Sequence, residues 1–396
     1  MIRRPPLFLV LLLALPTPFA MGIIVPSLGT ISKDLSVPYA LVQLLVTGFL
    51  LGMGLMVLVI GPLTDWLGRR PVLLTGLAIF VAGSLLGSFS DSIQGLVFFR
   101  LLQSAGAAAC TVISIIVTRD SCDDATARRN ITYIMAATEV GVLISTPIGG
   151  HLAMLAGWHS IFAATTVLGV ILLVASIAFL PETRPLMIDK PGFFALFSNY
   201  RKLIRKPVFF SNVLAAALGG GSGLILLVVT PSILENNFHI NVARVGDLFM
   251  LNSMVYVLGA MVVLRFERFV SPGPLLMGLL SISLFICLAF IVLLLGFGPL
   301  FWTVLISLYA LSSVRAGILA LGTTAAISSD LNMTGTASGL ANSLISILTA
   351  VIGACGGAFY AGNLLPPALF MAVCLGIGFS AYGAFLFRNQ SRYALK

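Results

Sequence analysis

The chain has 396 residues, of which 59% are hydrophobic and only 9% are charged, and its formal net charge is +9. A soluble domain carries about 25% charged residues, so this composition excludes a soluble multi-domain enzyme and indicates an integral membrane protein. The five cysteines form no CxxC pair, and the three histidines have no metal-ligand spacing. The sequence therefore predicts neither a disulfide framework nor a metal site, and no cofactor.

The N-terminal 20 residues resemble a signal peptide, but the apolar run continues through residues 21–28 and is too long for the core of such a peptide. We therefore interpret it as the first spanning helix. About 20 apolar residues are needed to cross a bilayer, and in chain order this length predicts twelve helices, at residues 6–29, 40–61, 72–89, 95–117, 130–154, 158–180, 207–230, 244–264, 274–296, 298–322, 336–359 and 365–386.

The connections between these helices are short, apart from one polar segment in the middle of the chain. The predicted fold is an all-α membrane protein with twelve transmembrane helices in two six-helix bundles. The first bundle comprises residues 1–181, a cytoplasmic linker follows at 182–206, and the second bundle comprises 207–396.

The distribution of basic residues predicts the orientation, because cytoplasmic loops are enriched in Lys and Arg. With both ends in the cytoplasm, 18 basic residues lie on that side, 2 (Lys33 and Arg244) on the other, and Arg100 and Arg315 within helices. The 18 are Arg3, Arg4, Arg69, Arg70, Arg119, Arg128, Arg129, Arg184, Lys190, Arg201, Lys202, Arg205, Lys206, Arg265, Arg268, Arg388, Arg392 and Lys396. No single basic patch results, so nucleic acid is not an expected partner.

The two halves resemble each other at one charged turn. Residues 65–76, which follow the second predicted helix, and residues 267–278, which follow the eighth, share an acid, a Leu-Leu pair and a final glycine. The second copy lacks the arginine pair. Such repeats predict a binding site near the membrane midplane and alternating access by rocking of the halves.

Several stretches carry a family resemblance. VQLLVTGFLLG (42–52), GPLTDWLGRRPVLLTG (61–76), RLLQSAGAAA (100–109) and VTRD (117–120) occur in this order, with FMLN (249–252) and GTASGL (335–340) in the second half. They resemble the major facilitator superfamily, specifically its Bcr/CflA-type drug/proton antiporters, and the resemblance covers most of the chain. It implies the major facilitator fold.

In transporters of this type, the turn between the second and third helices resembles a conformational latch. The resemblance implies that Asp65 pairs with a basic group at the end of the fourth helix, for which Arg119 is the nearest fit. Gly61 and Gly68 would allow tight turns and close helix approach. Arg69 and Arg70 would face the membrane surface or acids such as Asp123 and Asp124; alternatively, they are only topology signals.

Glu139 is the predicted proton carrier. It lies about 15 Å into the fifth helix, at 1.5 Å per residue, where a charge is costly and indicates function. Gly141 and Ser145 lie on the opposite side of that helix, so they would pack on a neighbour while Glu139 faces the cavity. A structural Glu bonded to another helix is the alternative. The first helix has no acid where relatives often have an Asp, so Glu139 would substitute for it, with Asp247 as the next candidate.

Arg100 and Gln103 share a face of the fourth helix, and the matching family motif has an arginine implicated in proton coupling. Arg315 would hold an anionic substrate group, or pair with Asp330 or Asp247. Gln43, Gln103, Asn252, Arg315 and Asn342 are candidate cavity residues, although each amide would equally suit an interhelical hydrogen bond. The fifth helix carries Gly141, Pro147, Gly149 and Gly150, which are similar to the Gly- and Pro-rich antiporter signature.

The predicted function is proton-driven export of small molecules across the inner membrane of a bacterium by a monomer, with the substrate, protons and the lipid bilayer as partners. No Walker A sequence is present, so ATP is not the expected energy source. The alternatives are a siderophore or metabolite exporter with anionic cargo and a non-transporting membrane sensor. No catalytic cluster has usable spacing, so an enzyme is not expected.

Overall fold

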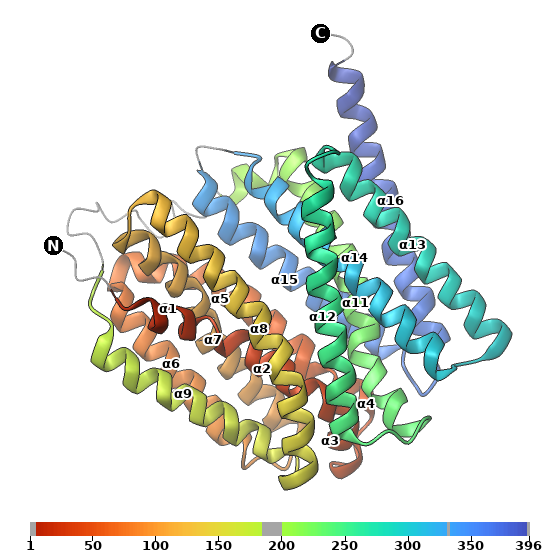
Figure 1. Ribbon diagram of the computed structural model, residues 1–396, viewed down its shortest axis with the longest axis horizontal. Coiled ribbons are helices and arrows are strands. Elements are labelled where there is room, and N and C mark those ends of the chain that lie inside the picture. Colours follow the sequence, from red (N-terminus) through yellow and green to blue (C-terminus); the bar gives the residue numbers. More distant parts are fainter. Residues whose placement is uncertain (1–4, 184–199, 331–332, 394–396) are drawn as a thin grey trace. The chain divides into compact units, whose positions relative to one another are not determined.

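A computed structural model describes residues 5–183, 200–330 and 333–393. Within these residues all regular elements are helices, and twelve spans are long and apolar enough to cross a membrane (Figure 1). The predicted fold class is therefore confirmed. Of the predicted linker at 182–206, residues 184–199 lie outside the described ranges.

The first span is broken into short helices because Pro16, Pro18 and Pro26 cannot donate backbone hydrogen bonds. Each of the next five spans contains one long helix, and in the second span the short helix α4 precedes it. The elements are α1 (Leu7–Leu13), α2 (Pro16–Ile24), the 3-10 helix η1 (Val25–Ser27), α3 (Leu28–Asp34), α4 (Tyr39–Val42), α5 (Leu44–Leu67), α6 (Arg69–Gly87), α7 (Ile93–Ser121), α8 (Asp124–Ala156) and α9 (His159–Phe179).

The remaining six spans are single helices: α11 (Pro207–Asn236), α12 (Val242–Phe266), α13 (Pro272–Phe297), α14 (Phe301–Ile327), α15 (Thr334–Ala358) and α16 (Leu365–Tyr393). Several helices extend further than predicted from the apolar runs, among them α5, α8, α11, α14 and α16. The helix expected at 130 begins at Asp124, because Asp123 accepts a hydrogen bond from the Thr126 N–H and so caps it. The helix expected to end at 230 continues to Asn236.

The chain divides into two compact units. The first comprises Met1–Phe193 and His239–Met250, and the second comprises Phe194–Phe238 and Leu251–Lys396. The sequence analysis did not predict that residues 239–250, which include the first turns of α12, would group with the first unit.

The first unit is built around α7, which packs on α5 and α6. Gly106 permits the close approach of α7 to α6, since a Cβ there would lie 2.3 Å from the carbonyl oxygen of Gly76 on α6. Buried leucines and valines from α1, α6, α7 and α9 complete this core. In the second unit the central helix is α11, which packs on α14, α15 and α16 and is buried along nearly all of its length.

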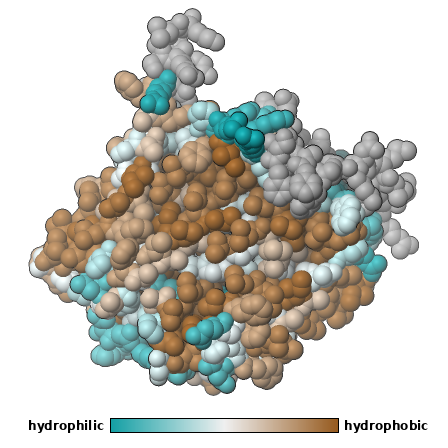
Figure 2. Space-filling view, turned by 180° about the vertical axis from the view of Figure 1, so that it is seen from behind, coloured by the Kyte–Doolittle hydropathy of each residue, from teal (hydrophilic) through white to brown (hydrophobic). Residues whose placement is uncertain are grey.

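Large apolar side chains cover much of the surface. On α9 and α13 they recur along one face, at Val167, Val170, Ile171, Val174, Ile177, Ile282, Phe285, Leu288, Val292 and Leu295. Figure 2 shows the same pattern on one face of the molecule, where hydrophobic residues dominate and hydrophilic residues gather mainly near the margins. A surface of this kind is suited to lipid.

Candidate functional site

An ion-pair cluster fixes the turn between α5 and α6. The guanidinium of Arg69 is 3.0 Å from the Asp65 carboxylate one turn earlier and 2.9 Å from the Asp120 carboxylate near the end of α7. It also donates to the Thr64 carbonyl at 2.9 Å. The Arg69 side chain is 5% exposed, against 16% for Asp120 and 40% for Asp65. Arg69 is therefore the buried centre that links three helix ends.

A second carboxylate holds the other side of this turn. The two Glu182 oxygens accept the backbone N–H groups of Arg69 and Arg70 at 3.0 and 3.1 Å, so they cap the start of α6. Gly68, at φ +103°, makes the turn in a conformation that side chains rarely adopt, and a Cβ there would lie 2.7 Å from Glu182. Arg70 donates from its side chain to the Ile177 carbonyl.

Three expectations about the latch are therefore wrong. The basic partner of Asp65 is Arg69 rather than Arg119, which is exposed, because the acid at the end of α7 is Asp120 and it draws Arg69 inward. Arg69 consequently faces Asp65 and Asp120 rather than the membrane surface or Asp123. Gly61 makes no close helix approach, since a Cβ added there would meet open space.

Arg100 lies at the centre of a polar network inside the first unit. It is 1% exposed, donates to the carbonyl oxygens of Leu45 and Ala20 at 3.0 and 3.1 Å, and stacks over the Phe49 ring at 4.3 Å. It also donates to Gln103, whose amide nitrogen donates to Ser84 and Thr165 at 2.7 and 3.2 Å.

This network corrects the assignment of Gln103 to a cavity wall. Gln103 is buried, and its amide is bonded within the bundle. For Arg100, Nη2 has no hydrogen-bond partner among the described residues. A buried guanidinium is costly unless its donors are satisfied, so Nη2 is a group that another state or a ligand would stabilise.

Helix α8 packs through its small residues on α2. A Cβ at Gly141 would lie 3.0 Å from Pro18, and one at Gly149 would lie 1.9 Å from the Ile23 carbonyl oxygen. Ser145 lies one helical turn from each of these glycines and is buried, with its hydroxyl against Gly22. Pro147 lies inside the helix. Glu139 is partly exposed rather than deeply buried.

Helix α8 also meets the first turns of α12, within the first unit. Gly150 faces Gly246, since a Cβ at Gly150 would lie 3.1 Å from the Gly246 Cα. One residue further along each helix, His151 Nε2 is 3.4 Å from Asp247 Oδ1, and both side chains are about half exposed. Asp247 thus has an imidazole beside it that the sequence analysis did not identify.

The candidates of the second unit are separated. Arg315 on α14 lays its side-chain stem against α11, where a Cβ at Gly223 would be 2.7 Å from Arg315 Cδ. The proposed partner Asp330 instead bonds Lys206 at 2.6 Å, because both lie at the same end of this unit. Asn252 is buried, and its Oδ1 has no hydrogen-bond partner among the described residues. Asn342 is exposed and donates to the Ser338 carbonyl.

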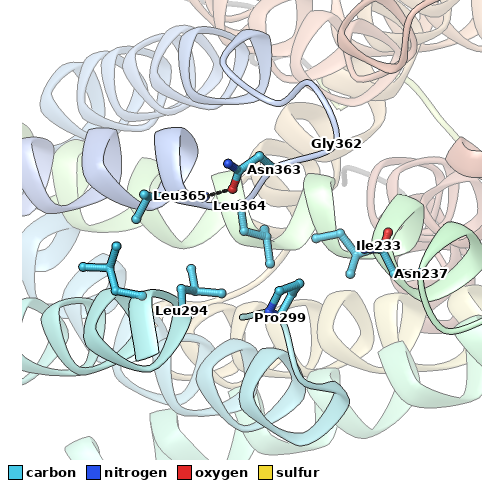
Figure 3. A pocket seen from close by; sticks show the side chains of 9 residues that line it. Ile233, Asn237, Leu294, Pro299, Gly362, Asn363, Leu364 and Leu365 are labelled. Atoms are coloured by element: carbon cyan, nitrogen blue, oxygen red, sulfur yellow. Dashed lines mark hydrogen bonds between the residues drawn. The ribbon is translucent and has the colours of Figure 1, made fainter. Parts of the chain in front are cut away.

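One cavity of about 380 Å³ lies at the Asn236 end of the second unit (Figure 3). Its apolar walls come from the end of α11, the α13–α14 turn and the start of α16, and Asn363 beside it accepts the Leu365 N–H at 2.9 Å. None of the residues predicted for the substrate cavity lines it. Gln43 is buried elsewhere, in the first unit between α4 and α5.

The sequence analysis missed three acids that the structure makes prominent. Asp120 and Glu182 hold the α5–α6 turn. The RD pair at 119–120 marked the right place at the end of α7, but the sequence analysis selected Arg119 of this pair instead of Asp120. Glu235 was assigned to a loop because the apolar run ends near residue 230. It lies within α11 and is buried.

Comparison with known proteins identifies the relatives of the chain. The Major Facilitator Superfamily model matches residues 10–354. The "Uncharacterized MFS-type transporter YdgK" of Bacillus subtilis is 26% identical over 348 residues, 87% of this chain and 86% of the relative. The "Multidrug resistance protein MdtL" of Escherichia coli is 29% identical over 226 residues, 56% of each chain.

Solved structures share the fold at lower identity. A bacterial homolog of the human lysosomal transporter Spinster, in an inward-facing conformation, superposes with a TM-score of 0.76 at 16% identity over 96% of both chains. A D-xylose-proton symporter gives a TM-score of 0.73 at 11% identity, over 94% of this chain and 96% of that one. At such identities the likeness concerns the fold alone.

Proposed function

Because the chain belongs to the Major Facilitator Superfamily and is a multi-pass membrane transporter of that fold, we propose that it exports small molecules in exchange for protons, as a drug/proton antiporter of the Bcr/CflA type. The observation that carries this proposal is the similarity to MdtL, a multidrug resistance protein, over 226 residues. Alternating access would move the cargo, with the proton gradient as the energy source.

Proton coupling needs a group that titrates within a membrane helix, and Glu139 on α8 is the proposed carrier. Its side chain is partly exposed, while Gly141 and Gly149 of the same helix pack on α2. Asp247, next to His151, is the second candidate. Arg100 would couple through its unbonded Nη2, which is a donor ready for an acceptor that enters during the cycle.

For the substrate we propose contacts to Asn252, whose buried Oδ1 is ready to accept a hydrogen bond, and to Gln43, Arg315 and Asn342. Apolar binding sites with a few polar groups are typical of small-molecule recognition. The charged cluster of Asp65, Arg69 and Asp120 is too well paired to be a cargo site. It is proposed as the conformational latch, together with Gly68, Arg70 and Glu182.

The proposal is tested in reconstituted vesicles with an imposed pH difference. The wild type is expected to concentrate a fluorescent cationic drug such as ethidium against its gradient. Glu139→Gln keeps the side-chain shape and removes the titration, so it should abolish uphill transport while downhill exchange persists. Glu267→Gln changes an exposed acid between α12 and α13 and serves as the matched control. Uphill transport by Glu139→Gln equal to the wild type would make Glu139 structural.

We also propose a bacterial inner-membrane location with both termini in the cytoplasm, from the 18-to-2 distribution of basic residues. A reporter fused after Lys396 that is active only in the periplasm should stay silent. A signal from it would contradict the orientation.

Anionic cargo is the second candidate, favoured by Arg315 within α14, since a cation in a membrane helix is costly and usually functional. In the same vesicles, an organic carboxylate would then be transported and ethidium would not. Arg315→Gln should abolish transport of that carboxylate.

A further inference from the structure

Glu235 is the only buried acid among those whose side chains the structure describes. It is 8% exposed, whereas the other described Asp and Glu residues, Glu139 among them, are partly or fully exposed. A carboxylate removed from water is costly in its ionised form, and an acid retained within a membrane helix indicates function. The transport roles proposed above do not use Glu235.

The position of Glu235 on α11 adds to this cost. It is the second-last residue of a 30-residue helix, Pro207–Asn236. The unpaired carbonyl groups at a helix C-terminus give it a partial negative charge, which repels a carboxylate. Burial and the helix end therefore both raise the cost of a charged side chain at this position.

A small polar cluster lies beside Glu235. On a helix, residues three apart share a face, so Ser232 lies next to Glu235. The Ser232 hydroxyl accepts from Asn236 Nδ2 at 3.0 Å and from the buried Tyr360 hydroxyl at 3.4 Å, just beyond the end of α15. Hydroxyl and amide groups of this kind can bond a carboxyl group in either protonation state, which a purely apolar wall cannot.

The helices packed on α11 supply little charge. Among residues 272–327 and 335–387, which include most of α13, α14, α15 and α16, the single Asp, Glu, Lys, Arg or His is Arg315. Its stem meets α11 at Gly223, twelve residues from Glu235 and thus about 18 Å along the helix at 1.5 Å per residue. The other titratable residues on or beside these helices are cysteines and tyrosines: Cys287, Cys355, Cys374, Tyr309, Tyr360 and Tyr382.

We propose that Glu235 is a proton-binding residue of the transport cycle, located in the second unit at the Asn236 end of α11. The inference rests on the proposed proton-coupled export. With both termini in the cytoplasm, α11 begins on the cytoplasmic side and its Asn236 end faces the periplasm. Glu235 then takes up protons from the periplasmic side, where they are abundant, and releases them in the state of the cycle that is open to the cytoplasm, so that one proton crosses the membrane in each cycle. The step is a proton transfer to and from the carboxyl group, with no other bond changed.

The titration is measured without any substrate, by pH-difference infrared spectroscopy of the protein in vesicles. A protonated carboxylic acid has a carbonyl stretch separate from the bands of a carboxylate. The wild type is expected to show a pH-dependent acid band that Glu235→Gln removes and Glu235→Asp moves. Glu267→Gln, an exposed acid, should leave it unchanged. A band that is identical in the wild type and both Glu235 variants would overturn the proposal.

Transport of ethidium driven by a pH difference separates this inference from the proposed function. Glu235→Gln should reduce uphill transport to the level of protein-free vesicles, retain downhill exchange and flatten the pH profile of that exchange. Glu235→Asp, which keeps a titratable group, should retain uphill transport with a displaced pH profile, and it remains informative where Glu235→Gln does not fold. If the wild type itself shows no pH-driven transport, the proposed function fails and the inference with it. If the wild type is driven and Glu235→Gln equals it, only the inference fails.

Discussion

Arg69 should stabilise the first unit far more than its partner Asp65 does. Arg69 and Asp120 are largely buried, at 5% and 16% exposure, and are 2.9 Å apart, whereas Asp65 is 40% exposed. Removing one member of a buried pair leaves the other charge uncompensated and costs about 3–5 kcal/mol. Since Asp120 keeps some contact with water, we expect about 3 kcal/mol for Arg69→Met. For Asp65→Asn we expect at most about 1 kcal/mol, because exposed pairs contribute little.

The assay is equilibrium unfolding in mixed micelles with a rising fraction of denaturing detergent. Trp66, which is exposed next to the cluster, reports on the turn by its fluorescence. The double variant Arg69→Met/Asp120→Asn should recover part of the loss, because no unpaired charge then remains. Equal losses of stability in Arg69→Met and Asp65→Asn would refute this account of the cluster. So would a double variant whose loss of stability exceeds the sum of the losses in its two single variants.

Three further predictions use the same unfolding measurement. Gly149→Ala should lower the free energy of unfolding by about 1–3 kcal/mol, since its Cβ would lie 1.9 Å from the Ile23 carbonyl oxygen. The control is Gly61→Ala, whose Cβ meets open space, and it should change the free energy of unfolding by less than about 1 kcal/mol. Glu182→Gln should cost about 1 kcal/mol by weakening the cap of α6, whose two N–H groups it accepts; no change would mean that water replaces it. Hydrogen bonds from Thr126 lower the pKa of Asp123, so its stabilising effect is present at neutral pH and is lost as the pH falls through that lowered pKa. The stability difference between the wild type and Asp123→Ala should therefore shrink on acidification, and a difference that grows would contradict the sign.

Hydropathy and charge were sufficient to predict the helices, because a bilayer requires about 20 apolar residues per span. They misplaced helix ends where a polar residue extends a helix. At α8, the Asp123 cap begins the helix before its apolar run, and at α11 the helix continues for six residues beyond the predicted end at 230. The second error concealed Glu235, since a residue assigned to a loop is not considered as a buried acid.

The partners within the candidate site were harder to predict than its members. The turn at 61–76 indicated Asp65 and Arg69, but whether Arg119 or Asp120 faces them depends on the rotation of α7 by one residue, about 100°. A resemblance to a sequence motif does not predict this rotation of the helix. Likewise, Gln103 shares a face with Arg100 as predicted, and the structure turns that face into the bundle, where Ser84 and Thr165 accept its amide.

Each unit has an acid near the end of its fourth span, and the two units pair this acid with basic residues from different elements. An acid closes the fourth span of each half: Asp120 in the last turn of α7, and Asp330 three residues after α14. Asp120 pairs with Arg69 from the turn before the third span, whereas the corresponding turn at 267–278 lacks the arginine pair and has only Arg268, and Asp330 pairs with Lys206 directly before α11. An acid near a helix C-terminus is unfavourable without a cation, so the acid requires a base but does not determine which element supplies it. The missing arginine pair in the second repeat is therefore compensated by Lys206, and the buried Arg69 cluster belongs to the first unit alone.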